Sequence, residues 1–309
     1  MWPEPPERAR IRFIKAVASP ADLGIQPSFW ERLGELVAGK AEAWMIRPTG
    51  IAVRGEVLYV ADPGAQALWI LDGTAGRFKE IRGPKEQRLA SPVAVALGRE
   101  GKIYVADSYL RRVLIFDPKS ALAGFMESPA FERPAGVAYD EVVDRLYVAD
   151  SAAHRIWVFS GQGVAQGEIG GRGSEDGHFN YPTHVALDRA GNLYVTDSLG
   201  FRIQMFGRDK RFLSAFGRHG DASGDFAAPK GLGVDSEGHV YVVDALFDAV
   251  QVFDRTGQFL LGFGQRGLGP GRFWLPGGLF IDEKDRIYVA DSYNQRVQIF
   301  QYLAGGGDG

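Results

Sequence analysis

Short apolar segments separated by polar residues and glycine-rich turns run along almost the whole chain. Residues 58–62 (Leu-Tyr-Val-Ala-Asp) are typical of them, because they form a β-rich run that ends on an aspartate. A proline and a shorter apolar run precede this segment at 48–53. In the next unit, the corresponding segment at 103–107 is followed by an alternating run at 112–116. Apolar runs of this length bounded by turn residues predict β-strands throughout the chain.

The strand that ends on aspartate recurs at nearly constant spacing. Its aspartates are Asp62, Asp107, Asp150, Asp197, Asp244 and Asp291. The intervals are 45, 43, 47, 47 and 47 residues, and each of the first five units holds four short apolar runs. A period in the forties with four strands per unit is typical of a β-propeller blade, whereas helical and leucine-rich solenoids have other patterns. The sequence therefore predicts an all-β, six-bladed β-propeller of four-stranded blades.

The sixth unit stops after its third strand, since only 302–304 and a glycine-rich tail follow the run at 296–300. Near the N-terminus, residues 10–17 form a strand-like segment without a repeat of their own. We expect this strand to complete blade six and to cover its open edge. The predicted organisation is a proline-rich tether at 1–9, a single propeller at 10–304 with a helix-containing insert at 18–46, and a flexible tail at 305–309.

Composition narrows the possible chemistry. The 309 residues include 41 glycines, which suit six sets of tight turns, and no cysteine. Disulfide frameworks, thiolate metal sites and cysteine nucleophiles are therefore excluded. No stretch of 18 apolar residues occurs, so we expect no transmembrane segment. The formal net charge of −3 gives no general attraction to nucleic acid.

The six units resemble NHL repeats. The likeness is clearest at 276–301 and extends over residues 47–300. It implies the six-bladed fold but no single function, because NHL propellers include scaffolds, RNA binders, ligand binders and a few lyases. Four of the six aspartates are followed after five residues by an arginine, which Ala67 and Ala249 replace in the other two units. We interpret the aspartates as structural turn carboxylates, with the arginines tying neighbouring strands.

In a propeller, the loops from the second to the third strand and the loops between blades share one face, here called the upper face. The sequence places many apolar, aromatic and basic side chains there or at the adjoining channel mouth: Tyr109, Leu110, His154, Phe179, Leu199, Phe201, Leu246, Phe247, Trp274, Tyr293, His184 and Lys230. Two interpretations stay open. These side chains either pack beneath neighbouring loops or form a contact surface for a protein or small ligand.

The insert at 18–46 joins the closing strand to blade one, so it also belongs to the upper face. Ser28 is a suitable N-cap for a helix over 28–37. Its apolar side chains recur at helical spacing on one stripe: Phe29, Trp30, Leu33 and Leu36. We expect this helix to act as a lid on the upper face, and a docking helix for a partner is the alternative.

The sequence contains no visible catalytic constellation. Of the residues that begin the inner strands, only His184 is a histidine, so the three-histidine zinc site of the amidating lyases that share this fold cannot be assembled. Carboxylates suited to calcium are missing from the same positions. We therefore expect no cofactor and no resident metal. RNA binding is a minor alternative, because Asp221, Asp225 and Asp248 lie among the basic candidates Arg111, Arg218, Lys230 and Arg266.

The sequence-based prediction is a non-catalytic binding or scaffold propeller with a protein partner or small ligand and no nucleic acid. A lyase or hydrolase with a metal-assisted site in the channel is the main alternative. The first seven residues lack the apolar core of a signal peptide and resemble the mature start of bacterial envelope propellers. This favours an envelope or extracellular location, with a lipid anchor possible on a precursor. A cytoplasmic location is the alternative.

Overall fold

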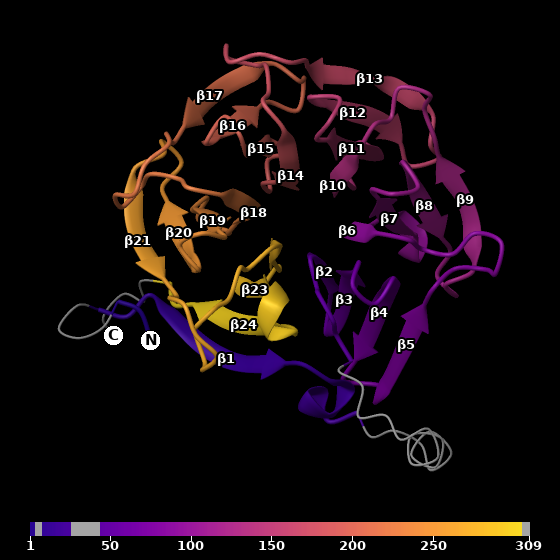
Figure 1. Cartoon of the computed structure of the whole chain (residues 1–309), viewed down its shortest axis with the longest axis horizontal. Coiled ribbons are helices and arrows are strands. Elements are labelled where there is room, and N and C mark those ends of the chain that lie inside the picture. Colours follow the sequence, from indigo (N-terminus) through magenta and orange to yellow (C-terminus); the bar gives the residue numbers. More distant parts are fainter. Residues whose placement is uncertain (4–7, 26–43, 305–309) are drawn as a thin grey trace.

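The strands of the computed structural model form six antiparallel, four-stranded sheets set as blades around a central axis (Figure 1). The structure describes residues 1–3, 8–25 and 44–304. The predicted six-bladed propeller is confirmed. The described part of the chain holds no helix with the length and apolarity needed to cross a membrane.

Each blade is numbered from the innermost strand outward. Blade one comprises β2 (Gly50–Arg54), β3 (Val57–Asp62), β4 (Ala67–Asp72) and β5 (Arg77–Ile81). Blade two comprises β6 (Pro92–Leu97), β7 (Ile103–Asp107), β8 (Arg112–Phe116) and β9 (Leu122–Met126). Blade three comprises β10 (Pro134–Asp140), β11 (Arg145–Asp150), β12 (Arg155–Ser160) and β13 (Ala165–Gly170). Blade four comprises β14 (Pro182–Leu187), β15 (Leu193–Asp197), β16 (Arg202–Phe206) and β17 (Phe212–Phe216). Blade five comprises β18 (Pro229–Val234), β19 (Val240–Asp244), β20 (Ala249–Phe253) and β21 (Phe259–Phe263). Blade six comprises β22 (Leu279–Ile281), β23 (Arg286–Asp291), β24 (Arg296–Tyr302) and β1 (Ile11–Val17). Three short 3-10 turns complete the described elements: η1 (Pro20–Leu23), η2 (Arg99–Gly101) and η3 (Ser292–Asn294).

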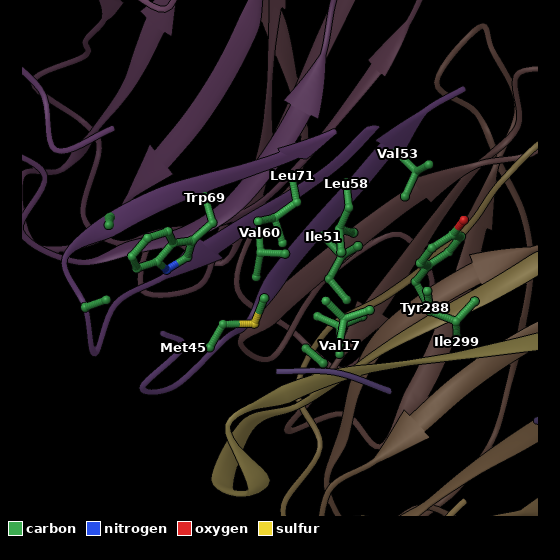
Figure 2. Packing of buried hydrophobic residues seen from close by; sticks show 14 of the residues in the cluster. Val17, Met45, Ile51, Val53, Leu58, Val60, Trp69, Leu71, Tyr288 and Ile299 are labelled. Atoms are coloured by element: carbon green, nitrogen blue, oxygen red, sulfur yellow. The ribbon is translucent and has the colours of Figure 1, made fainter. Parts of the chain in front are cut away.

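The second strand of a blade is buried on both faces, because neighbouring blades pack against each side of it. Every residue of β7, β15 and β19 is buried, and their sequences are accordingly almost continuously apolar. The outermost strand β17 instead alternates between half-buried and exposed residues. Buried apolar clusters lie between adjacent blades, and the one between blades six and one contains Val17, Val60 and Ile299 (Figure 2).

The N-terminal strand closes the ring, as the sequence predicts. β1 pairs antiparallel with β24, with Ile11 opposite Tyr302 and Val17 opposite Val297, so the indigo and yellow ends of the chain share one blade (Figure 1). Ile11 and Val17 are both buried. Glu56 of blade one also binds Arg286 and Lys284 of blade six, and these two bonds lower the pKa of Glu56 to about 2. Strand pairing, apolar packing and ion pairs therefore all contribute to closure.

Within the segment predicted to be a tether, Trp2 is fixed to the ring. Its backbone exchanges hydrogen bonds with Ile11 at 2.8 and 2.9 Å. Its ring packs against Phe263 and Phe300, with ring centroids 5.9 and 5.7 Å away. Trp2 is therefore an anchored part of the junction between blades five and six.

Glycines let the inner strands approach one another around the channel. A Cβ on Gly50 would lie 2.5 Å from Cα of Ala94 in the next blade and 2.8 Å from the carbonyl oxygen of Val93. A Cβ on Gly136 would lie 2.6 Å from the carbonyl oxygen of Thr183. At these two positions a larger residue would push the neighbouring backbone away, so glycine sets the width of the channel near the upper face.

Candidate functional site

The six aspartates that end the second strands organise the loops of the upper face. All six side chains are fully buried. Asp107 accepts backbone N–H groups of Ala90 and Ser91 from the preceding inter-blade loop, and of Tyr109 and Leu110 from its own loop, at 2.7 to 3.1 Å. The other five likewise accept backbone N–H groups from the inter-blade loop before them. The predicted role as structural turn carboxylates is confirmed.

The arginines that follow the aspartates act in two ways. Arg202 and Arg296 pair with Asp197 and Asp291 at 2.9 and 2.8 Å and also donate to carbonyl groups of the loop between blades. Burial raises the pKa of Asp197, although its bond to Arg202 opposes this shift.

Arg112 and Arg155 instead pair with glutamates near the outer edge of their blades, Glu127 and Glu168. The interpretation that the arginines tie neighbouring strands is confirmed for Arg155, Arg202 and Arg296, whereas Arg112 pairs with a glutamate just after the neighbouring strand β9.

Four loop-tip residues project apolar surface from the upper face. They stand two positions after the aspartates of blades two, four, five and six, and their exposed fractions are 77% for Tyr109, 52% for Leu199, 64% for Leu246 and 49% for Tyr293. Backbone hydrogen bonds hold each of them: Tyr109 and Leu246 donate to an aspartate, Leu199 and Tyr293 to a carbonyl of the inter-blade loop. Blades one and three have Gly64 and Ala152 at this position. The loop-tip residues thus expose apolar side chains from a backbone that is held by hydrogen bonds.

Other side chains predicted for the upper face are partly covered. Trp274 is 38% exposed and lies beside Tyr293, with ring centroids 5.6 Å apart. Phe201 is half-buried and lies beside His219, with ring centroids 4.4 Å apart. Phe247 is also half-buried.

Two more of these side chains make contacts with neighbouring segments. Leu110 packs on the cluster between blades one and two. His154 accepts the backbone N–H of Tyr181 at 3.1 Å through Nδ1. Some of these side chains therefore pack beneath or beside neighbouring loops, and others remain exposed.

Phe179 was predicted for the contact surface, and this prediction is wrong. Phe179 is fully buried and packs against Phe206, with ring centroids 5.7 Å apart. Gly170 has a positive φ of 84° and lies so close that a Cβ there would collide with the Phe179 ring. Phe226 and Phe273 occupy equivalent buried positions in the next two inter-blade loops. Each ring anchors its loop into the core between two blades.

The predicted lid helix cannot be placed on this face. Its residues Phe29, Trp30, Leu33 and Leu36 lie outside the described part of the chain. The described beginning of the same insert contains η1, which is followed by the buried Ile25.

The inner strands surround a channel cavity of about 360 Å³. Every blade contributes apolar wall residues, among them Val53, Leu97, Val137, Leu187, Val234 and Phe280. Charged side chains line the end away from the upper face, including Arg54, Glu141 and Lys284. His184 lies near the upper end and is the sole histidine among the described residues that line the cavity.

His184 is held as a neutral imidazole. Burial and the nearby Lys230 lower its pKa to about 3. The pKa of Lys230 is itself lowered by burial and by the charge of Arg133, which donates a hydrogen bond to the hydroxyl of Tyr181 at 2.7 Å. Both effects penalise an additional positive charge at this end of the channel. His184 and Lys230, which the sequence placed on the upper face or at the channel mouth, are close enough for the charge of Lys230 to act on His184.

The histidines and carboxylates of the upper face do not converge on a metal position. Within the described ranges, no three histidine, aspartate or glutamate side chains are grouped so as to hold a metal ion. His239 pairs with Asp235 at 2.8 Å in the loop between β18 and β19, on the face opposite the upper face.

The sheet order, the repeated aspartates and the closing N-terminal strand define a six-bladed propeller of the NHL type. The chain belongs to the Teneurin NHL domain family, whose family model matches residues 80–268, more than half of the chain. A family described as a 6-bladed beta-propeller matches residues 233–307. No curated protein matches the chain.

Several solved structures share this fold. A structural genomics protein of unknown function from Bacteroides thetaiotaomicron has a TM-score of 0.67 at 15% identity, covering 85% of this chain and 71% of its own. A streptogramin B lyase has a TM-score of 0.62 at 12% identity, covering 84% and 94%. An auxiliary nutrient binding protein from B. thetaiotaomicron has a TM-score of 0.67 at 12% identity, covering 84% and 69%. At these identities the likeness is one of fold alone.

Proposed function

We propose that this protein is a non-catalytic binding propeller that holds a protein partner on its upper face. The observation that carries the proposal is the set of four loop-tip residues, Tyr109, Leu199, Leu246 and Tyr293, which are apolar, exposed and fixed by backbone hydrogen bonds. Protein interfaces are built around such apolar and aromatic anchors. Because hydrogen bonds already hold the backbone of these loops, binding costs little backbone entropy.

The experiment compares two matched variants. The first changes the four loop-tip residues to serine. The control also introduces four serines, at apolar side chains that are exposed elsewhere on the ring: Ile14, Val164, Leu213 and Leu260. A partner is captured from a lysate with the unchanged protein, identified, purified and titrated against all three forms.

We expect the loop-tip variant to bind this purified partner at least about 30-fold more weakly, since interface anchors contribute 2 kcal/mol or more each. The control variant should bind as the unchanged protein does. Equal binding by the loop-tip variant, or an equal loss in the control, would contradict the proposal.

A channel enzyme is the second candidate, because His184 faces a cavity large enough for a small substrate. Its low pKa makes the imidazole a weak general base at neutral pH, which favours the binding function. Metal analysis of protein purified without chelator separates the two. Stoichiometric zinc or calcium would favour the enzyme, and protein without either would favour the binding propeller.

A further inference from the structure

A chain of hydrogen bonds leads from the core between blades to His184 in the channel. The hydroxyl of Ser198 donates to the carbonyl of Pro229 at 2.8 Å. Oγ of Ser198 lies 2.6 Å from Oγ1 of Thr183, which in turn lies 3.1 Å from Nδ1 of His184. Thr183 and Ser198 are both buried. These groups come from β14, β18 and the loop after β15, so the chain joins blades four and five.

Counting protons along this chain fixes the tautomer of His184. The carbonyl of Pro229 can only accept, so Ser198 uses its single hydroxyl proton there. Thr183 must therefore donate its own proton to Ser198, which leaves Oγ1 of Thr183 as an acceptor toward His184. Nδ1 of His184 is then the donor. In the neutral imidazole this makes Nε2 an acceptor with a free lone pair.

Nε2 has no hydrogen-bond partner among the described residues, and His184 lines the cavity. The walls beyond it are mostly apolar, so a ligand there needs an apolar body. The group that meets Nε2 must donate a hydrogen bond. A cation is opposed by the nearby charge of Lys230. An anion would be attracted by Lys230, but its oxygen carries no proton to donate to the lone pair of Nε2. Burying a net charge between apolar walls is also costly.

We propose that the central channel binds a small, uncharged, mostly apolar molecule, such as a phenol or an alcohol, that donates one hydrogen bond to Nε2 of His184. This site is separate from the loop-tip residues and extends beyond the proposed partner binding. Its failure would leave that proposal unaffected, because the loop-tip variant keeps the channel intact.

Three probes of similar shape test the assignment: 4-ethylphenol, 4-ethyltoluene, which replaces the hydroxyl with a methyl group, and the anion 4-ethylbenzoate. Their dissociation constants are measured by saturation-transfer NMR titration of the full chain. We expect the phenol to bind about tenfold more tightly than the toluene, the usual effect of one buried hydrogen bond. Equal affinities, no binding of the phenol, or tightest binding of the benzoate would overturn the proposal.

Two variants locate the preference for the phenol. His184→Phe keeps a ring but removes the acceptor, so the tenfold difference should disappear. His178→Phe makes the same change at an exposed histidine and should leave the difference intact. A preference that survives in His184→Phe would contradict the assignment.

A measurement on the unchanged protein guards against a variant that does not fold. In protein labelled with ¹⁵N-histidine, the His184 signals are assigned by elimination, and the proton should reside on Nδ1. On addition of 4-ethylphenol, the resonance of Nε2 should shift as it accepts the hydrogen bond. A proton on Nε2 in the free protein would overturn the proposal. Thr183→Val removes the acceptor of Nδ1–H and should reduce the tautomer preference together with the selectivity for the phenol.

Discussion

The carboxylate of Asp107 accepts the backbone N–H of Tyr109 at 3.1 Å, so a fully buried residue fixes the loop that presents a side chain 77% exposed. The same carboxylate also holds the inter-blade loop through Ala90 and Ser91. The repeat that builds the fold therefore also positions the proposed contact surface.

Removing this carboxylate should destabilise the propeller. Asp107→Ala leaves several partly buried backbone N–H groups without their acceptor, and we expect the free energy of unfolding to fall by about 3 kcal/mol. Asp117→Ala is the control, because Asp117 accepts the N–H of Ala121 on an exposed turn. It should cost less than about 1 kcal/mol. Urea denaturation measures both, and equal losses would contradict the role assigned to Asp107.

The closing strand should matter more than the end of the chain. Deleting residues 1–17 removes the whole of β1 and exposes the edge of β24. We expect this protein to aggregate or to unfold at a much lower temperature than the full chain. Deletion of 305–309 should leave the melting temperature unchanged. Similar thermal stability of both truncated proteins in calorimetry would show that closure does not depend on β1.

The width of the channel should depend on glycine. Gly50→Ala places a methyl group 2.5 Å from Cα of Ala94, and we expect a loss of about 1–3 kcal/mol, the usual cost of overpacking. Gly124→Ala, in the outer strand β9, meets no atom within 4 Å and should be neutral or slightly stabilising. Chemical denaturation of the two variants tests the difference, which a neutral Gly50→Ala would refute.

His184 should make the fold sensitive to mild acid. Its folded pKa is about 3, whereas an unfolded histidine titrates near pH 6.5. Between these values the unfolded chain binds a proton that the folded chain does not, so stability falls as the pH is lowered. Urea midpoints at pH 7 and about pH 4.5 should therefore differ less in His184→Phe than in the unchanged protein. An identical difference in both would mean that His184 is not held neutral by the fold.

Sequence was sufficient to predict the ring, because each blade repeats the same strand, aspartate and turn. It was also sufficient for β1, since the sixth unit visibly lacks a strand. Phe179 was misplaced because its position in a loop suggested exposure. The recurrence of the same ring at Phe226 and Phe273 was the available signal for a buried anchor.

The geometry around His184 was beyond the sequence. Thr183, Ser198 and Pro229 come from three segments, and the pairing of β14 with β15 shifts register between Pro182 and His184. Such a shift moves side chains between faces and leaves no local pattern. The greater exposure of Leu199 and Leu246 over Phe201 and Phe247 likewise depends on how the loops fold back.

Hydrogen–deuterium exchange of the protein with and without its captured partner tests partner binding on the upper face most directly. The account predicts slower exchange in the loops at 108–111, 198–201, 245–248 and 292–295. The loops on the opposite face, at 55–56, 98–102 and 141–144, should exchange at unchanged rates. Protection confined to the opposite face would contradict the account.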